Sequence, residues 1–195
     1  MTESGRPAVA VSALLVAAMA AAVSGCGVQP HEQIACKSGD SAIFLLEAQA
    51  VPSATLLPCF FPLPAGWRYG QSEVRSGFVS AWLDSDRVGD RAVELILTRT
   101  CNVSRAIRVP LAHTPRGLLR YDEPADSRAR SSISYFQFPG GCVTYRFSFT
   151  RQTAPTIFAE ADTFLGFTPR KLYVKSLRDQ EGLTLCGAEA PSCPG

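Results

Sequence analysis

The stretch that decides the fold is SISYFQFPGGCVTYRFSFT, residues 132–150. It divides into two β-rich runs, 132–138 and 142–150, joined by Pro139-Gly140-Gly141. The second run alternates polar residues with four large apolar ones, which are Val143, Tyr145, Phe147 and Phe149. Alternation with a period of two is typical of a strand with one buried and one wet face. Each of these apolar side chains would contribute about 1.5–3 kcal/mol if fully buried, so we predict a β-hairpin at the centre of the core.

Further strands are predicted upstream of this hairpin. Residues 76–84 and 91–100 are β-rich runs separated by a polar loop that contains a glycine, as hairpin loops often do. Residues 118–122 predict a short third strand. Residues 56–60 lie among prolines, so they are expected to form at most a short edge strand.

Three segments carry helical patterns. An acidic cap followed by good helix formers predicts a short helix within 38–50. Pro155 begins an apolar stripe that Gly166 ends, and Thr168-Pro169 begins a second pattern, about 169–181, that Gly182 ends. The apolar stripe of this second pattern is weak, so a strand over 171–175 is the alternative. We expect an α+β domain in which an antiparallel sheet of four or five strands carries two or three helices on one face, braced by disulfides.

The N-terminus has the features of an export signal. Arg6 precedes an apolar run, Ala8 to Val23, that is shorter than the roughly 20 residues a membrane-spanning helix needs. The run ends in Val23-Ser24-Gly25-Cys26, which resembles the lipobox of bacterial lipoproteins, with Val where Leu is usual. This resemblance covers residues 1–26 only. It implies cleavage before Cys26 and a diacylglyceryl group on the Cys26 sulfur. A plain signal peptide and an uncleaved helix are the alternatives.

The resemblance, taken with the length and composition of the rest of the chain, gives its expected organisation and location. Residues 1–25 form the signal peptide, 26–39 the lipidated cysteine and a flexible tether, and 40–195 one globular domain. Two or three acyl chains give a stable membrane anchor, whereas a single chain gives marginal binding. We therefore expect a lipid-anchored protein on the extracytoplasmic face of the cell membrane. Its first partners would be that membrane and the lipoprotein-processing enzymes.

The remaining six cysteines predict disulfides, and they are Cys36, Cys59, Cys101, Cys142, Cys186 and Cys193. An even number of cysteines in an exported chain indicates up to three bridges, with fifteen possible pairings. The spacings match neither a structural zinc site nor a thiol oxidoreductase. One pairing can be inferred. If the strands 91–100 and 142–150 are antiparallel neighbours, Cys101 and Cys142 lie close enough to bond.

Composition and motifs exclude several function classes. After residue 25 the chain holds 18 Lys and Arg against 16 Asp and Glu, too even a balance for a nucleic-acid binder. No phosphate-binding glycine loop, dinucleotide fingerprint or nucleophile-elbow motif is present. We therefore expect no nucleic-acid partner and no cofactor.

Candidate catalytic and metal-binding residues are few. His113 is the one histidine outside the tether, and it lies beside Thr114-Pro115 as surface-loop histidines do. Asp84, Asp86 and Asp90 are the densest carboxylates, but Val88 and Leu95 occupy positions where a calcium loop needs oxygen ligands. We interpret these aspartates as a solvated hairpin tip. The sequence therefore predicts neither a metal site nor an enzyme.

The most suggestive remaining feature is an aromatic, proline-rich loop. Phe60, Phe61 and Trp67 lie on either side of two prolines, Pro62 and Pro64, so this loop could present aromatic rings to a glycan or a peptide. The alternative is a flap packed over the sheet. We predict a non-enzymatic envelope binding or interaction module with an unidentified envelope ligand or protein partner. The alternative is a small envelope hydrolase whose carboxylates the sequence does not identify.

Overall fold

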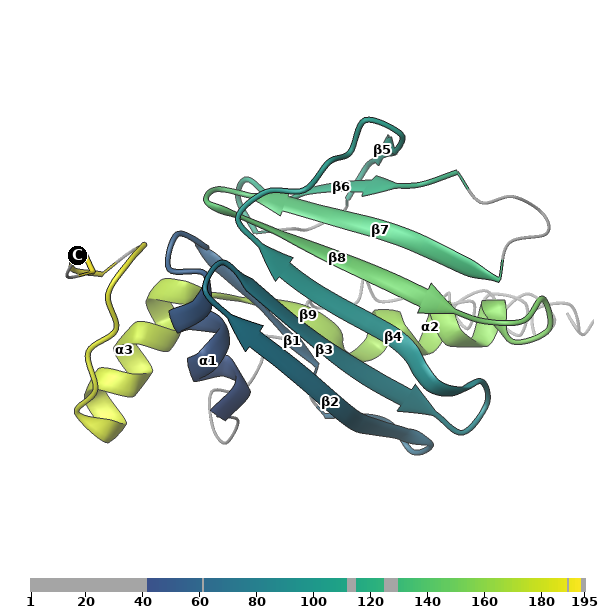
Figure 1. Ribbon diagram of the computed structural model, residues 1–195, viewed down its shortest axis with the longest axis horizontal. Coiled ribbons are helices and arrows are strands. Elements are labelled where there is room, and N and C mark those ends of the chain that lie inside the picture. Colours follow the sequence, from purple (N-terminus) through teal and green to yellow (C-terminus); the bar gives the residue numbers. More distant parts are fainter. Residues whose placement is uncertain (1–41, 61, 112–114, 125–129, 189, 194–195) are drawn as a thin grey trace, which may run out of the picture. The chain divides into compact units, whose positions relative to one another are not determined.

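The computed structural model describes residues 42–60, 62–111, 115–124, 130–188 and 190–193, and the side chains from Leu45 onward. The predicted signal peptide, the lipidation site Cys26 and the tether with Cys36 lie outside the described residues, as do Phe61 and His113. Within the described ranges the chain forms three helices and nine strands (Figure 1). The helices are α1 (Ala42–Ala50), α2 (Ala154–Phe164) and α3 (Arg170–Glu181).

Seven strands form one antiparallel sheet in the order β2-β3-β4-β8-β7-β6-β5. In that order the strands are β2 (Trp67–Arg75), β3 (Phe78–Ser85), β4 (Gly89–Thr98), β8 (Gly141–Ser148), β7 (Ser131–Phe138), β6 (Leu119–Asp122) and β5 (Ile107–Val109). The other two strands, β1 (Leu56–Phe60) and β9 (Leu165–Pro169), pair antiparallel in a small second sheet.

The domain is therefore mostly β, and the prediction of an α+β domain with four or five strands covered by helices is wrong. Its helices are short, at 9, 11 and 12 residues. Strand β2 was missed because most of its side chains are exposed, so its sequence lacks an apolar face. Strand β5 has three residues, two of them exposed, which is too short a run for any pattern. Strand β9 follows α2 directly, where Gly166 suggested a helix end.

The predicted hairpin is present as β7 and β8, and β8 is the middle strand of the large sheet. Val143, Tyr145 and Phe147 are buried along one face of β8, while Arg146 on the other face is exposed. The turn between the strands contacts the segment after α1. Gly140 has a positive φ of 73°, and a Cβ at this position would lie 1.8 Å from the carbonyl oxygen of Ser53. Glycine is therefore required there.

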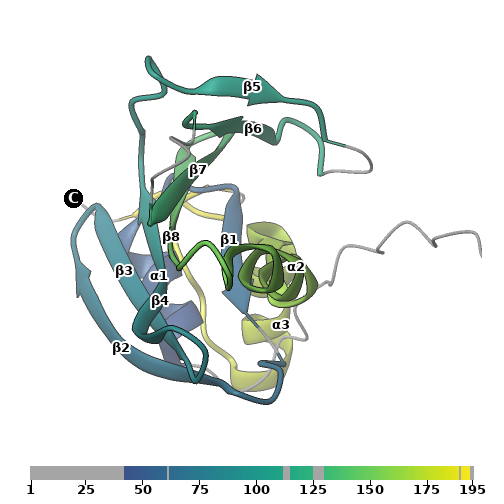
Figure 2. The ribbon, with the colours of Figure 1, turned by 90° about the vertical axis from the view of Figure 1, so that its right-hand side faces the viewer.

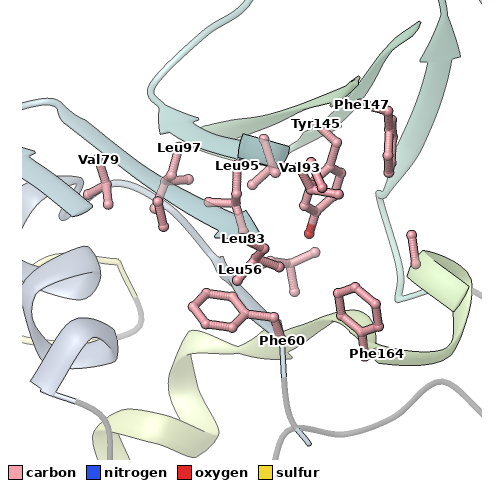
Figure 3. Packing of buried hydrophobic residues seen from close by; sticks show 14 of the residues in the cluster. Leu56, Phe60, Val79, Leu83, Val93, Leu95, Leu97, Tyr145, Phe147 and Phe164 are labelled. Carbon is pink, nitrogen blue, oxygen red and sulfur yellow. The ribbon is translucent and has the colours of Figure 1, made fainter. Parts of the chain in front are cut away.

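The main core lies between the inner face of the seven-stranded sheet and a layer made by β1, α2 and β9. Figure 3 shows Leu83, Leu95 and Tyr145 of the sheet facing Phe60 of β1 and Phe164 of α2. All five side chains are at most 2% exposed. The second layer is thus partly strand, which explains why helices alone do not cover this face.

A smaller cluster lies on the far side of β1, between α1, α3 and the C-terminal segment. Its buried residues are Ala48, Leu57, Cys59, Tyr173, Val174, Leu177 and Leu185. Because alternate residues of β1 enter the two clusters, this strand is buried along its whole length rather than lying at an exposed edge. Arg170 at the start of α3 is fully buried, and its guanidinium donates 2.7 Å hydrogen bonds to the carbonyls of Ala48 and Cys186.

Two disulfides join described residues, Cys101–Cys142 and Cys186–Cys193. The first is the pairing expected from neighbouring strands, because β4 pairs with β8 and Thr98 lies opposite Cys142. Cys59 is also disulfide-bonded. The prediction of a disulfide-braced domain is confirmed.

Candidate functional site

One flank of the main core is incompletely covered, and four phenylalanines gather there. We call this set the phenylalanine flank: Phe136 on β7, Phe149 just after β8, Phe158 on α2 and Phe167 on β9, with Leu111 and Leu165. All six side chains pack against the core and are partly exposed. The flank lies where the large sheet meets the α2–β9 layer, so two layers supply its residues.

Ring contacts join the flank into one continuous aromatic row. Phe136 and Phe167 have ring centroids 5.4 Å apart, and Phe149 and Phe158 have centroids 5.2 Å apart. Buried rings link these pairs, since Phe147 lies 5.2 Å from Phe158, and Tyr145 lies 6.3 Å from Phe147 and 5.5 Å from Phe136. Tilted and edge-on contacts at these distances are the favoured aromatic geometries. The row is therefore a connected aromatic strip that is partly exposed at its two ends and buried between them.

A polar pair borders the strip on β6. The Arg120 guanidinium lies 5.5 Å from the centroid of the Phe136 ring, and its Nε donates a 2.9 Å hydrogen bond to Asp122 Oδ1. The strand register places both residues on the same face of the sheet as Phe136 and Tyr145. Ligand sites typically combine such an apolar lining with a few placed polar groups.

Strands β5 and β6 form an arm that extends beyond the helices on this side of the sheet (Figure 2). The inner-face rows of the arm continue from the core, since Tyr145 pairs with Ser134, Ser134 with Asp122, and Asp122 with Ile107. Ile107 ends this row and is 64% exposed. The inner face of the sheet therefore extends from the buried rings of the core to the exposed edge at β5.

The aromatic residues predicted as a contact surface lie elsewhere. Phe60 and Trp67 are 1% and 6% exposed, and both belong to the main core. Phe60 stacks on Tyr69, and the Trp67 ring packs 4.9 Å from that of Phe164. Both residues therefore serve packing, as the flap alternative implied, and neither presents a ring to a partner.

Glu47 and Tyr145 are among the enclosed polar side chains whose oxygens have no hydrogen-bond partner in the described structure. Glu47 of α1 is 1% exposed, and neither carboxylate oxygen has a partner in the described structure. Burial raises the pKa of this carboxyl well above its ordinary value. Tyr145 Oη is likewise enclosed without a partner, and burial together with the charge of Glu47 raises the tyrosine pKa. A carboxyl sealed in this way has no route to a substrate.

The aspartates weighed as a calcium loop make local contacts. Asp84 accepts a 2.9 Å hydrogen bond from the backbone N–H of Arg91 and lies 3.7 Å from Arg68, and Asp86 lies 3.6 Å from Arg87. Among the described residues, no group of three or more His, Cys, Asp or Glu side chains is arranged to hold a metal ion. The same residues include no helix both long and apolar enough to cross a membrane.

The members of the phenylalanine flank were visible in the sequence as core residues but not as a site. Phe136 and Phe149 continue the alternation of their strands, and Phe158 belongs to the apolar stripe of its helix. Phe167 was placed beyond the expected helix end. The exposure of all four depends on how far the α2–β9 layer extends across the sheet, which is a tertiary property without a local signal.

Comparison with protein-family models, curated proteins and solved structures finds no match to this chain.

Proposed function

We propose that this chain is a lipid-anchored, extracytoplasmic, non-enzymatic binding module that holds an apolar or amphiphilic envelope ligand along its phenylalanine flank. The observation that carries the proposal is the continuous row of rings whose two ends, Phe136 with Phe167 and Phe149 with Phe158, are partly exposed. Soluble domains rarely leave contiguous apolar surface open unless something binds there.

The chemistry of the flank favours an elongated ligand with a polar end. The rings come from a helix and three strand segments, and the buried rings of Tyr145 and Phe147 separate the two partly exposed ends, so a ligand that contacts both ends must be elongated. Arg120 and Asp122 at its border offer both hydrogen-bond donors and an acceptor to a polar head. The hydrolase alternative needs carboxylates that converge at an accessible surface, and no described contact supports it.

Fluorescence titration with a dansyl-labelled long-chain fatty acid tests the flank. Replacing Phe136 or Phe158 by Gln removes about 1.5–3 kcal/mol of apolar contact, so the affinity should fall roughly tenfold to a hundredfold. Phe78→Gln is the matched control, because Phe78 is also partly exposed but lies on the opposite face of the sheet under the guanidinium of Arg75. Equal affinity in all three variants would reject the flank as the binding surface.

The anchor is tested separately. Mass spectrometry of the processed N-terminus should find two or three acyl chains on Cys26, and Cys26→Ala should move the protein from the detergent phase to the aqueous phase. Retention of both forms in the detergent phase would favour an uncleaved helix. Aqueous partitioning of both forms would mean that no acyl chain is attached.

A further inference from the structure

The positive charge of the described chain is concentrated in one part of the sheet. Residues 99–151, which include β5 to β8 and their connections, hold eight described arginines and two described carboxylates, Asp122 and Glu123. Residues 42–98 hold four described arginines and six carboxylates. The even balance of the whole sequence therefore conceals a basic region, residues 99–151, and an acidic region, residues 42–98.

Most of these arginines make no ion pair with a described carboxylate. Arg120 and Arg146 pair with Asp122 and Glu94. The other six are exposed and make no ion pair with a carboxylate in the described part of the chain, and they are Arg99, Arg105, Arg108, Arg116, Arg130 and Arg151. Guanidinium groups left unpaired on a surface are available to an anionic partner.

Three of the six lie within the arm or close to it in sequence. Arg105 and Arg108 lie just before and within β5, and Arg116 lies in the connection from β5 to β6. Ile107, the most exposed large hydrophobic side chain described, lies between the first two. Figure 2 shows β5 as the outermost strand of the arm, beyond the helices. Ile107 lies on the inner face of β5 and Arg108 on the outer face, so a contact made edge-on would present both an apolar side chain and arginines. This combination suits the interface of an anionic bilayer, where arginines contact phosphates and the apolar group enters the headgroup boundary.

We propose that the β5 edge docks onto anionic phospholipid headgroups, with Arg105, Arg108 and Arg116 contacting phosphates and Ile107 inserting among them. The occupant follows from charge complementarity and from the exposed isoleucine, and it does not depend on the ligand of the phenylalanine flank. Docking would hold the arm, and with it the Arg120 end of the flank, against the membrane surface.

Ile107→Trp supplies a reporter for this contact. The full chain carrying Ile107→Trp is reconstituted in vesicles of brominated phosphatidylcholine, either alone or with 30% phosphatidylglycerol, and its tryptophan quenching is compared with that of the parent chain. Tryptophan is favoured at the membrane interface. We expect quenching on the anionic vesicles at low salt, little on the neutral ones, and a decline as salt screens the charges. Leu172→Trp, at an exposed position on α3, is the control reporter and should stay unquenched on both.

Charge variants test whether the arginines of the β5 edge cause the docking. Each arginine near an anionic surface contributes roughly a fivefold factor, so R105Q/R108Q/R116Q should lower the docked-to-undocked ratio about a hundredfold. The variant R68Q/K171Q/R178Q removes the same charge from exposed positions outside this region and should leave docking intact. Fatty-acid binding should be unchanged in both, which separates this proposal from the proposed function.

Three results would overturn the proposal. Equal quenching on neutral vesicles would mean that the anchor alone brings the arm to the bilayer. An equal loss of docking in both triple variants would show that docking depends on the net charge of the protein and not on the β5 edge. An absence of quenching on anionic vesicles would show that the β5 edge faces a protein or solvent instead.

Discussion

The indole Nε1 of Trp67 donates a 2.7 Å hydrogen bond to Oε2 of Glu160, which links β2 to α2 across 93 residues of sequence. Arg87 donates a 2.9 Å hydrogen bond to the same oxygen. This shared carboxylate connects the edge strand of the large sheet to the helix opposite it. Trp67 is 6% exposed, so its N–H has little access to water if the acceptor is lost.

Glu160→Ala should therefore lower the free energy of unfolding by about 1–3 kcal/mol, because it leaves a buried donor unpaired. Glu160→Gln keeps an oxygen acceptor for the indole and should cost less. Urea denaturation measures both. Asp162→Ala, at an exposed site on the same helix, should change stability by no more than about 0.5 kcal/mol. Equal costs for the Ala and Gln variants would assign the effect to the ion pair with Arg87 instead.

Glu47 should make the domain less stable as the pH rises. Burial raises the pKa of its carboxyl in the folded state, so the folded protein holds a proton that the unfolded chain releases above its ordinary pKa of 4.5. The free energy of unfolding should thus be highest below that value. It should fall by about 1.4 kcal/mol per pH unit until the folded carboxyl also ionises.

Glu47→Gln should remove this dependence and raise the stability at neutral pH relative to the parent protein. The measurement is urea denaturation between pH 4 and pH 8, read as the difference between the two proteins. Tyr145 and Tyr173, whose pKa values are raised chiefly by burial, remain neutral across this range. Glu73→Gln, on an exposed side chain, is the control and should leave the profile unchanged. A flat difference between the parent and Glu47→Gln would contradict the prediction.

Gly140→Ala should lower the free energy of unfolding by about 2–4 kcal/mol, through left-handed backbone strain and steric overlap together. The overlap arises because the new methyl group would meet the Ser53 carbonyl, and the turn would have to give up the 2.7 Å bond from Ser53 Oγ to the Gly140 carbonyl. Gly77→Ala separates the two causes, since Gly77 has a φ of 77° with open space around it. Gly77→Ala should lower the free energy of unfolding by about 1–2 kcal/mol. Similar values for the two variants would show that the turn moves without penalty.

The two described disulfides should differ in their effect on stability. Cys101 and Cys142 are 41 residues apart, whereas Cys186 and Cys193 are 7 apart. Loop-closure entropy then predicts a loss of about 4 kcal/mol for C101S/C142S and about 2.5 kcal/mol for C186S/C193S. Thermal and urea denaturation of the double variants measure both losses. The reverse order would show that packing around the bridges outweighs chain entropy.

The central part of this fold was predictable because its side chains alternate. Tyr145 and Phe147 mark β8, and the strand neighbourhood they imply leads to the Cys101–Cys142 bridge. Gly182 was also predicted as the end of a helix, and its φ of 67° closes α3 with bonds from Gly182 to Arg178 and from Leu183 to Leu177. These features depend on residues close in sequence or on a strict period.

The parts that were missed depend on partners distant in sequence. Strand β9 forms because β1 offers hydrogen-bonding groups more than a hundred residues earlier, and Pro169 and Gly166 suggested helix boundaries instead. Likewise, Phe60 and Trp67 looked available because prolines surround them, yet the sheet and α2 enclose both. The phenylalanine flank is defined by where a covering layer stops, so no short motif could indicate it.

Arg170 carries a consequence for how the chain acquires its structure. Its guanidinium joins the carbonyl of Ala48 to that of Cys186, and its backbone N–H bonds to Thr55. The hydrogen bonds that Arg170 makes to the first helix and to the segment before the first strand therefore form only when the C-terminal part of the polypeptide is present. A ribosome that releases this chain from its N-terminus would hold it without a complete core until residue 186 emerges.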